Sequence, residues 1–164
     1  REAMLVDCRD FDPRLPEFVK AEKIQLTTIF ITHEHWDHVQ ALPIAAKHFG
    51  ARVISAIPDP SGLAGVQVAR PGDTVTVGDL TGRVADTSGH TAVGLSLVFP
   101  ELVFTGDALF AGAVGGTKNP EDYTRQLDNI RTNLFTLPDD TIVCPGHGPC
   151  STIGIERRFN PFFV

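Results

Sequence analysis

The chain runs Thr32-His33-Glu34-His35-Trp36-Asp37-His38 immediately after the apolar segment Ile29-Phe30-Ile31. It holds six His among 164 residues, so composition alone would place about 0.2 His in a window of six. Three His fall within this one window. The cluster is too dense to be a product of composition, and it is the point from which the rest of the sequence is interpreted.

The spacing inside this window favours metal binding. His33 and His35 stand two apart at the end of an apolar strand, so both side chains can project to one side and share an ion. Asp37 and His38 lie where the chain turns toward a helix and can face a second ion. Imidazole and carboxylate ligands suit zinc, iron or manganese. No Cys falls in the cluster, which argues against a structural zinc finger.

Three more candidate ligands follow a glycine at or just beyond a predicted strand. They are His90 in Ser88-Gly89-His90, Asp107 in Gly106-Asp107, and His147 in Gly146-His147-Gly148. Glycine permits the sharp turns that aim a strand-end side chain into a cleft. We therefore expect the three strand ends to meet at one rim. Two other carboxylates near strand ends, Asp7 and Asp86, could either hold a ligand imidazole or lie as solvated turn residues.

The remaining pattern predicts an α+β layered domain of short strands and amphipathic helices. A Gly78-Asp79 link between two alternating runs indicates an antiparallel hairpin. The helices are expected at about residues 15–22, 39–49 and 120–137, where Asn119-Pro120 is a typical helix start. The strands are expected at residues 3–7, 26–32, 51–56, 74–77, 80–86, 94–99, 102–105 and 141–144.

Composition bounds the function classes. The formal net charge is −6, which argues against nucleic-acid partners, because such binding depends on clustered cationic side chains. No apolar run approaches the roughly 20 residues of a membrane span, and we expect one domain over residues 1–164. The three cysteines, Cys8, Cys144 and Cys150, lack CxxC spacing. They indicate small buried thiols in a reducing compartment and a cytoplasmic protein.

The motif order HxHxDH, Gly-His, Gly-Asp and Pro-Gly-His-Gly resembles that of the metallo-β-lactamase-fold hydrolases, most closely their glyoxalase II-like branch in its short form, without the C-terminal helical domain. The resemblance extends from Leu5 to Phe163. It implies an αββα four-layer sandwich, abbreviated at the N-terminus. It also implies two divalent ions, zinc first and iron or manganese as alternatives. Carried over by position, the first ion would be bound by His33, His35 and His90, the second by Asp37, His38 and His147, and both by Asp107 as a bridge.

The function that the resemblance implies is a binuclear hydrolase similar to hydroxyacylglutathione hydrolases. It would cleave a thioester or related activated acyl bond with metal-bound hydroxide, and Asp37 would orient the proton of that nucleophile. The expected partner is a small, anionic acyl substrate, with Trp36, Phe110 and Lys118 as candidate contacts, and the chain could form a homo-oligomer. Gly116 stands where glyoxalase II enzymes carry a basic residue that contacts glutathione.

Three alternatives stay open at this point. A β-lactam hydrolase is one, although such enzymes commonly have Cys or no ligand at the position of Asp107. A mononuclear-iron persulfide dioxygenase would share the same ligands, although it carries a basic residue at the position of Gly116. An inactive fragment of such a domain would bind no metal. Metal analysis separates these possibilities.

Overall fold

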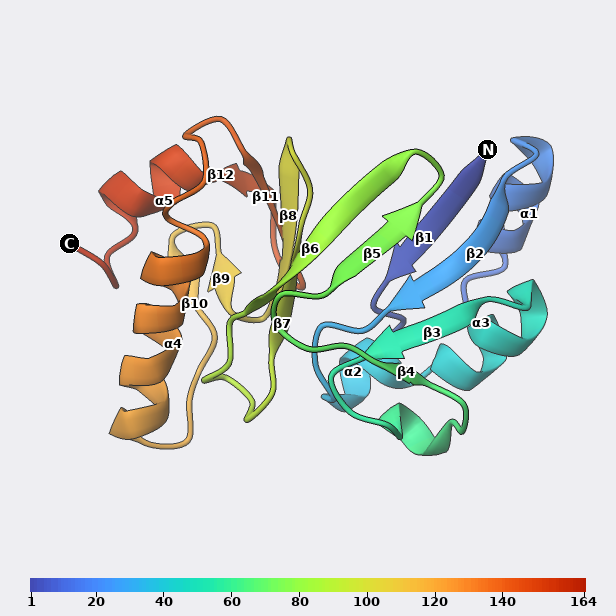
Figure 1. The fold of residues 1–164 in the computed structure, drawn as a ribbon, viewed down its shortest axis with the longest axis horizontal. Coiled ribbons are helices and arrows are strands. Elements are labelled where there is room, and N and C mark those ends of the chain that lie inside the picture. Colours follow the sequence, from blue (N-terminus) through green and yellow to red (C-terminus); the bar gives the residue numbers. More distant parts are fainter.

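Two β-sheets lie face to face between two layers of helices in the computed structural model, which describes residues 1–164 (Figure 1). The first sheet is parallel throughout, with strand order β1-β2-β3-β4. Its strands are β1 (Glu2–Val6), β2 (Gln25–Phe30), β3 (Arg52–Ser55) and β4 (Gln67–Val68). This arrangement confirms the expected αββα sandwich.

The second sheet has six strands in the order β12-β11-β8-β7-β6-β5. They are β5 (Thr74–Val77), β6 (Leu80–Asp86), β7 (Leu95–Val98), β8 (Leu102–Gly106), β11 (Ile142–Pro145) and β12 (Ser151–Thr152). β5 and β6 form the predicted antiparallel hairpin around Gly78-Asp79. A separate short hairpin pairs β9 (Leu109–Phe110) with β10 (Ala113–Val114).

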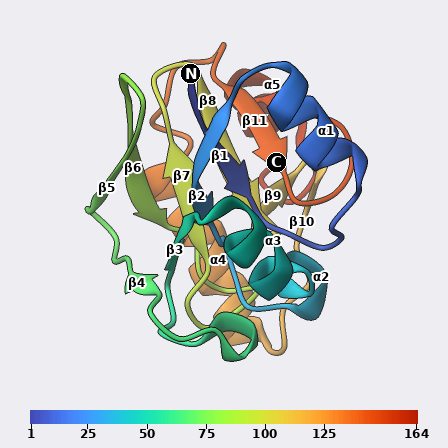
Figure 2. The same ribbon diagram turned by 90° about the vertical axis from the view of Figure 1, so that its right-hand side faces the viewer.

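Helices cover the outer face of each sheet (Figures 1 and 2). Beside the first sheet lie α1 (Arg14–Ala21), α2 (Trp36–Val39) and α3 (Leu42–Phe49), and beside the second lie α4 (Pro120–Asn133) and α5 (Ile153–Phe159). A short 3-10 helix spans Pro60–Gly62. None of these helices combines the length and apolarity that a bilayer crossing requires.

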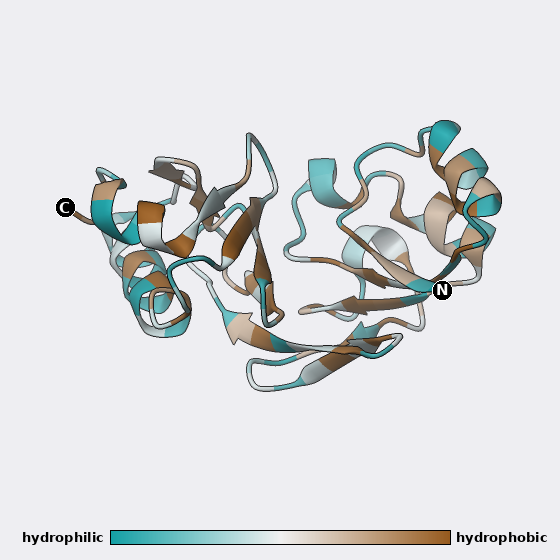
Figure 3. Ribbon diagram, turned by 90° about the horizontal axis from the view of Figure 1, so that it is seen from above, coloured by the Kyte–Doolittle hydropathy of each residue, from teal (hydrophilic) through white to brown (hydrophobic).

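Apolar side chains fill the three spaces between the four layers. Phe30, Ile54 and Leu97 belong to the cluster between the two sheets. Ile29 and Leu42 belong to the cluster beneath α1 and α3, and a third cluster packs the second sheet against α4 and α5. Figure 3 shows this pattern as hydrophobic strands and helices of mixed character. Because apolar side chains occupy the spaces between the layers, the candidate ligands lie beyond these clusters, at the strand ends.

The predicted helix at residues 39–49 is wrong as a single element. The chain forms α2 and α3 with a break at Gln40 and Ala41. Pro43 lacks the N–H that a continuous helix would need, and the Ala41 N–H donates to the carbonyl of Cys8 instead of to the preceding turn. The break lets α2 turn its own residues toward the sheet ends independently of α3.

The strand directions bring distant segments to one edge of the sandwich. β8 runs parallel to β11, and β6 runs parallel to β8 because both are antiparallel to β7. The carboxyl ends of β6, β8 and β11 therefore point the same way. The Leu95 N–H donates to the Thr32 carbonyl at 2.9 Å and joins this edge to the end of β2.

Candidate metal centre

Four strand ends supply the seven predicted ligands. His33 and His35 follow β2, and Asp37 and His38 lie in α2. His90 comes from the loop after β6, Asp107 comes directly after β8, and His147 lies two residues beyond the end of β11. The structure brings all seven together, and the three that follow a glycine, His90, Asp107 and His147, meet at one rim as expected.

Three ring nitrogens converge to form the first donor group. His35 Nδ1 lies 3.2 Å from His33 Nε2 and 2.9 Å from His90 Nε2. The candidate donor atoms of these three residues all lie within 4.8 Å of one another. One cation of the size of zinc fits a donor set of this kind.

A second donor group lies beside the first. It consists of Asp37, His38 and His147, again with all donor atoms within 4.8 Å of one another. His147 Nε2 lies 3.2 Å from Asp37 Oδ2. His33, His38 and Asp107 make a third group that overlaps both. The candidate ligands thus form one continuous cluster.

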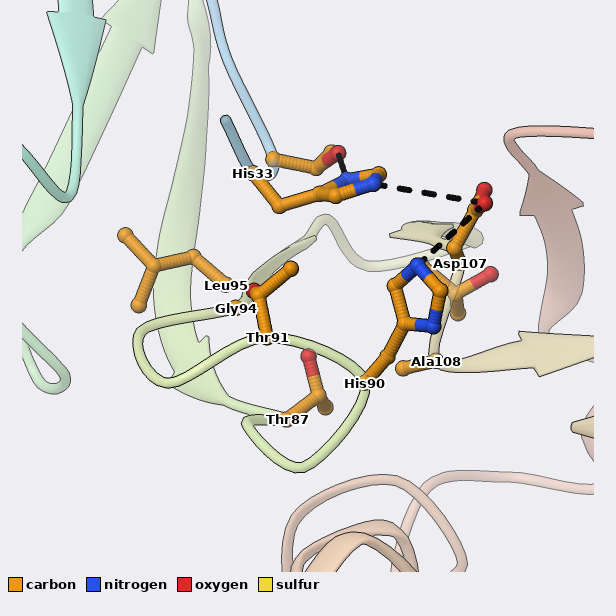
Figure 4. A pocket seen from close by; sticks show the side chains of 10 residues that line it. His33, Thr87, His90, Thr91, Gly94, Leu95, Asp107 and Ala108 are labelled. Carbon is orange, nitrogen blue, oxygen red and sulfur yellow. Dashed lines mark hydrogen bonds and ion pairs between the residues drawn. The ribbon is translucent and has the colours of Figure 1, made fainter. Parts of the chain in front are cut away.

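Asp107 is the centre of the cluster. Its Oδ2 lies 4.0 Å from His33 Nε2, 3.7 Å from His90 Nε2 and 3.6 Å from His147 Nε2. Its Oδ1 lies 3.3 Å from His38 Nε2. In Figure 4 the side chains of His33, His90 and Asp107 point toward one another across a pocket. A carboxylate in this position can bind two ions at once.

Hydrogen bonds at the outer nitrogens set the orientation of the rings. Thr32 Oγ1 donates to Asp7 Oδ2 at 2.8 Å, so it can accept the Nδ1–H of His33 at 3.0 Å. His38 Nδ1–H donates to Asp7 Oδ2 at 2.7 Å, and His90 Nδ1–H donates to the Gly116 carbonyl at 2.6 Å. These partners leave each Nε2 lone pair facing the cluster.

Asp7 and Asp86 have different roles. Asp7 contacts both Thr32 and His38 and so holds the second donor group. Asp86 contacts no ligand: its Oδ1 accepts from the Ser88 N–H at 2.8 Å and from Asn129 Nδ2 at 3.3 Å. Asp86 therefore shapes the loop that leads to His90.

Burial and neighbouring charges shift the pKa values of the imidazoles in different directions. Burial, with the His38 charge in second place, lowers the pKa of His33 to about 3, and burial also lowers the pKa of His35. Burial acts the same way on His38, but the carboxylate of Asp107, 3.3 Å from its Nε2, and that of Asp7, which accepts its Nδ1–H, outweigh it and raise the pKa to about 10. Burial would raise the pKa of Asp107, but the adjacent, charged His38 ring lowers it. Without metal, His38 is a cation between two carboxylates.

The cluster fits a metal ion on the evidence of its own unpaired atoms. His38 Nε2 and Asp107 Oδ1 are buried, and neither has a hydrogen bond of good geometry. Buried polar groups of this kind are normally satisfied, by a ligand if not by protein. A Cβ at Gly146 would lie 2.3 Å from Asp107 Oδ1, so the chain is shaped to bring His147 close. The donors are imidazole and carboxylate, which suit zinc, iron and manganese.

The three predicted substrate contacts lie at different places around the cluster. The Trp36 side chain is 63% exposed, and the Arg9 guanidinium lies 5.6 Å from its ring. The Phe110 ring lies 6.3 Å from that of His147. Lys118 lines a cavity of about 110 Å³ beside His35 and His90.

That cavity also contains two residues that the sequence did not single out, Glu34 and Arg125. Glu34 Oε2 is buried without a hydrogen-bond partner. Its position within the histidine window was an available signal. Arg125 comes from α4, far along the chain, and no local pattern marks it.

Comparison with known proteins matches nearly the whole chain to one protein superfamily. Residues 1–147 match the family model described as "Metallo-beta-lactamase superfamily". The chain is 30% identical to "Hydroxyacylglutathione hydrolase GloC" of Haemophilus influenzae, over 99% of this chain and 87% of that protein.

Two solved structures are similar over nearly the full length. The crystal structure of ETHE1 from Myxococcus xanthus has 36% identity and a TM-score of 0.87, covering 98% of this chain and 73% of that one. The BLEG-1 B3 metallo-beta-lactamase has 28% identity and a TM-score of 0.86, covering 99% and 89%. The similar proteins carry names of different kinds, so the substrate must be argued from the site.

Proposed function

Since this chain belongs to the metallo-beta-lactamase superfamily, we propose that it is a binuclear metal-dependent hydrolase of thioesters or related activated acyl bonds. The observation that carries the proposal is the position of Asp107 between two complete donor groups. A cluster built for one ion would need only one of these groups. The similarity to a hydroxyacylglutathione hydrolase supports the choice of an acyl substrate.

The seven candidate ligands have different proposed roles, which depend on the donor group to which each belongs. His33, His35 and His90 would hold one ion, Asp37, His38 and His147 the other, and Asp107 would contact both. When bound, divalent ions of this kind lower the pKa of a water molecule toward neutrality and polarise a carbonyl oxygen. Zinc is the proposed metal, with iron and manganese as alternatives.

Asp37 is the proposed catalytic residue. It is partly exposed, and its Oδ2 lies 3.2 Å from His147 Nε2, so the carboxylate is anchored while part of it faces the open side of the cluster. A carboxylate so placed accepts a proton from an attacking water molecule and holds it near the leaving group. No Ser, Cys or Lys nucleophile is needed.

The substrate is proposed to be a small, anionic acyl compound. Lys118 lines the cavity beside His35 and His90 and would attract a carboxylate, whereas Arg125 of the same cavity is paired with Asp122 at 2.6 Å. The backbone carbonyl of Gly116 is used to hold His90, and this residue carries no cationic side chain for glutathione. A thioester with a different anionic thiol is therefore as good a candidate as a glutathione thioester.

Metal analysis and substrate assays test the proposal together. We expect two zinc-like ions per chain, and turnover of lactoylglutathione or a simple anionic thioester above turnover of a chromogenic β-lactam. Asp37→Asn should lower kcat about 100-fold or more, with circular dichroism unchanged. Asp140→Asn, which changes an exposed carboxylate, is the matched control. No turnover of any acyl substrate by the metal-loaded protein would refute the hydrolase.

A mononuclear-iron persulfide dioxygenase is the second candidate, because each donor group is complete enough to hold a single ion. One iron per chain, with oxygen consumption on a persulfide, would favour it. A metal content of zero would favour an inactive fragment.

We also propose a cytoplasmic location and a homo-oligomer. All three cysteines are free in the structure, as in proteins of reducing compartments. Cell fractionation and light scattering test these two points.

A further inference from the structure

Two thiols face each other across the hairpin that carries His147. The β11–β12 register pairs Ile142 with Thr152 and Val143 with Ser151. One further step brings Cys144 opposite Cys150, and their Sγ atoms lie 4.0 Å apart, with the Cys150 S–H donating. The expectation of small buried thiols is therefore wrong for Cys150, which is exposed, and Cys144 is only half-buried.

The backbone at this position suits a disulfide. The Ile153 N–H donates to the Thr141 carbonyl at 3.0 Å, which marks that facing pair as hydrogen-bonded. Such pairs alternate along an antiparallel ladder, so Cys144 and Cys150 form a non-hydrogen-bonded pair, with Cα atoms about 4.5 Å apart. Disulfides span Cα separations of about 4.4 to 6.8 Å. The sulfurs, 4.0 Å apart, must approach by about 2 Å to reach a bond of about 2.05 Å, through rotation of the side chains and movement of the adjoining hairpin backbone.

We propose that Cys144 and Cys150 are a redox-sensitive dithiol, which a low-molecular-weight disulfide oxidises to an intramolecular disulfide that displaces the His147 loop (residues 145–149). The loop has no other residue between the cysteines than Pro145, Gly146, His147, Gly148 and Pro149. Neither proline has an N–H, so the ladder cannot continue across the loop. A disulfide between the two cysteines would thus be a covalent cross-link at the base of the loop that carries His147.

The chemistry proceeds by two exchanges. The exposed Cys150 thiolate attacks the small disulfide, forms a mixed disulfide and releases one thiol. The Cys144 thiolate then attacks Cys150 Sγ and releases the second thiol, so two protein thiols are oxidised and one small disulfide is reduced. Burial, followed by the neighbouring Cys150, raises the pKa of Cys144 to about 11. Cys144 is therefore mostly a thiol at neutral pH, so the second step should be the slower one and should accelerate as the pH rises.

The consequence for the metal centre rests on the proposed function. His147 Nε2 lies 3.2 Å from Asp37 Oδ2 and 3.6 Å from Asp107 Oδ2. Metal sites hold their ligand distances to within about 0.2 Å, and closing the disulfide shortens the separation of the sulfurs by about 2 Å, so about a tenth of that movement passed on to His147 reaches this limit. Oxidation should therefore weaken the second ion about tenfold or more, as loss of a ligand's support does. Formation of the disulfide itself does not depend on the hydrolase proposal.

The first experiment treats the metal-free full chain with glutathione disulfide, alkylates free thiols and digests with trypsin. Both cysteines lie on one peptide, residues 132–157. We expect this peptide to lose the mass of two hydrogens in the wild type and in Cys8→Ser. Cys144→Ser should instead stop at a mixed disulfide on Cys150. A wild-type protein that also stops there, stays fully alkylatable or links only to a second chain would overturn the proposal.

The second experiment measures zinc binding against a chromophoric chelator, before and after the same oxidation. We expect the second zinc to bind about tenfold more weakly in the oxidised wild type and equally well in treated and untreated Cys144→Ser/Cys150→Ser protein. Equal affinities in oxidised and reduced wild type would overturn the displacement of the loop. A reduced wild type with fewer than two zinc ions would overturn both that displacement and the binuclear centre, and would leave the mass result to decide the disulfide.

Discussion

Asp7 is the residue that connects the first strand to the candidate ligands. Its φ of 58° is in the left-handed region, an unusual conformation for a residue other than glycine. In this conformation its carboxylate reaches His38 Nδ1 at 2.7 Å and the Thr32 backbone N–H at 2.8 Å. The strained backbone is thus tied to the orientation of a ring 31 residues away.

Replacing Asp7 by Asn should weaken zinc at the second donor group about 10- to 100-fold, because a neutral amide accepts the His38 Nδ1–H less strongly than a carboxylate and leaves the ring a weaker ligand. Competition with a chelator measures this affinity. Asp10→Asn changes an exposed carboxylate nearby and should leave both affinities unaltered. An unchanged second affinity in Asp7→Asn would show that Asp7 supports only the turn.

Gly146 limits the approach of the His147 loop to the cluster. An added Cβ would lie 2.3 Å from Asp107 Oδ1 and 2.6 Å from His38 Cε1. Gly146→Ala should therefore reduce zinc stoichiometry from two toward one, while far-UV circular dichroism stays native. At Gly116 a Cβ meets nothing within 4 Å, so Gly116→Ala should bind as the wild type does. Full stoichiometry in Gly146→Ala would mean that the loop adjusts without cost.

At the scale of elements, α4 supports the segment that follows Asp107. Asn119 caps this helix through a 2.8 Å bond from the Asp122 N–H, as the Asn-Pro start predicted. Gln126 on the same helix is fully buried, and its Nε2 donates to the carbonyls of Ala108 at 3.0 Å and Gly115 at 3.1 Å. One side chain thus holds both ends of the β9–β10 hairpin.

Gln126→Leu should lower the free energy of unfolding by about 1–3 kcal/mol, because it leaves the Gly115 carbonyl without its donor and the Ala108 carbonyl with only the 3.4 Å bond from the Gly115 N–H. Urea denaturation measures the loss. Asp128→Leu removes an exposed carboxylate whose 3.3 Å contact with Arg131 contributes little, and it should change stability much less. Equal losses in the two variants would argue against a role for the buried bonds.

At the scale of the whole molecule, the opposite pKa shifts of His33 and His38 predict how the stability of the metal-free protein depends on pH. The pKa of His33 is about 3 in the folded protein and 6.5 as its ordinary value, so this group costs stability as pH falls from 6.5 toward 3. The pKa of His38 is raised to about 10, so its contribution is complete below 6.5 and lost as pH rises toward 10. The two together place the maximum near the ordinary His value.

Thermal unfolding in a chelator, from about pH 5 to about pH 9, checks this expectation, which follows from the folded-state pKa values. The wild-type Tm should peak near the middle of the range. His38→Asn should abolish the fall on the alkaline side and keep the fall on the acid side. A wild-type Tm that does not decline above pH 6.5 would contradict the charged state assigned to His38.

The elements that sequence periodicity predicted were those with enough residues to carry a pattern. The eight expected strands and the helix at Pro120 are present within a few residues of their predicted bounds. The two-residue strands β4, β9, β10 and β12 were missed, as was α5. Strands that short have no periodicity, and their pairing depends on a partner strand elsewhere in the chain.

The sequence by itself determined the chemistry available to this protein: the donor types, their order along the chain and the strand ends that carry them. Those features are local, because side-chain identity and hydrophobic period are read over a few residues. The tertiary structure alone decided that Asp7, and not Asp86, holds a ligand ring, that Arg125 lies beside His90, and that Cys144 faces Cys150. The first two depend on contacts between segments far apart in sequence, and the third on a strand register that no local pattern specifies.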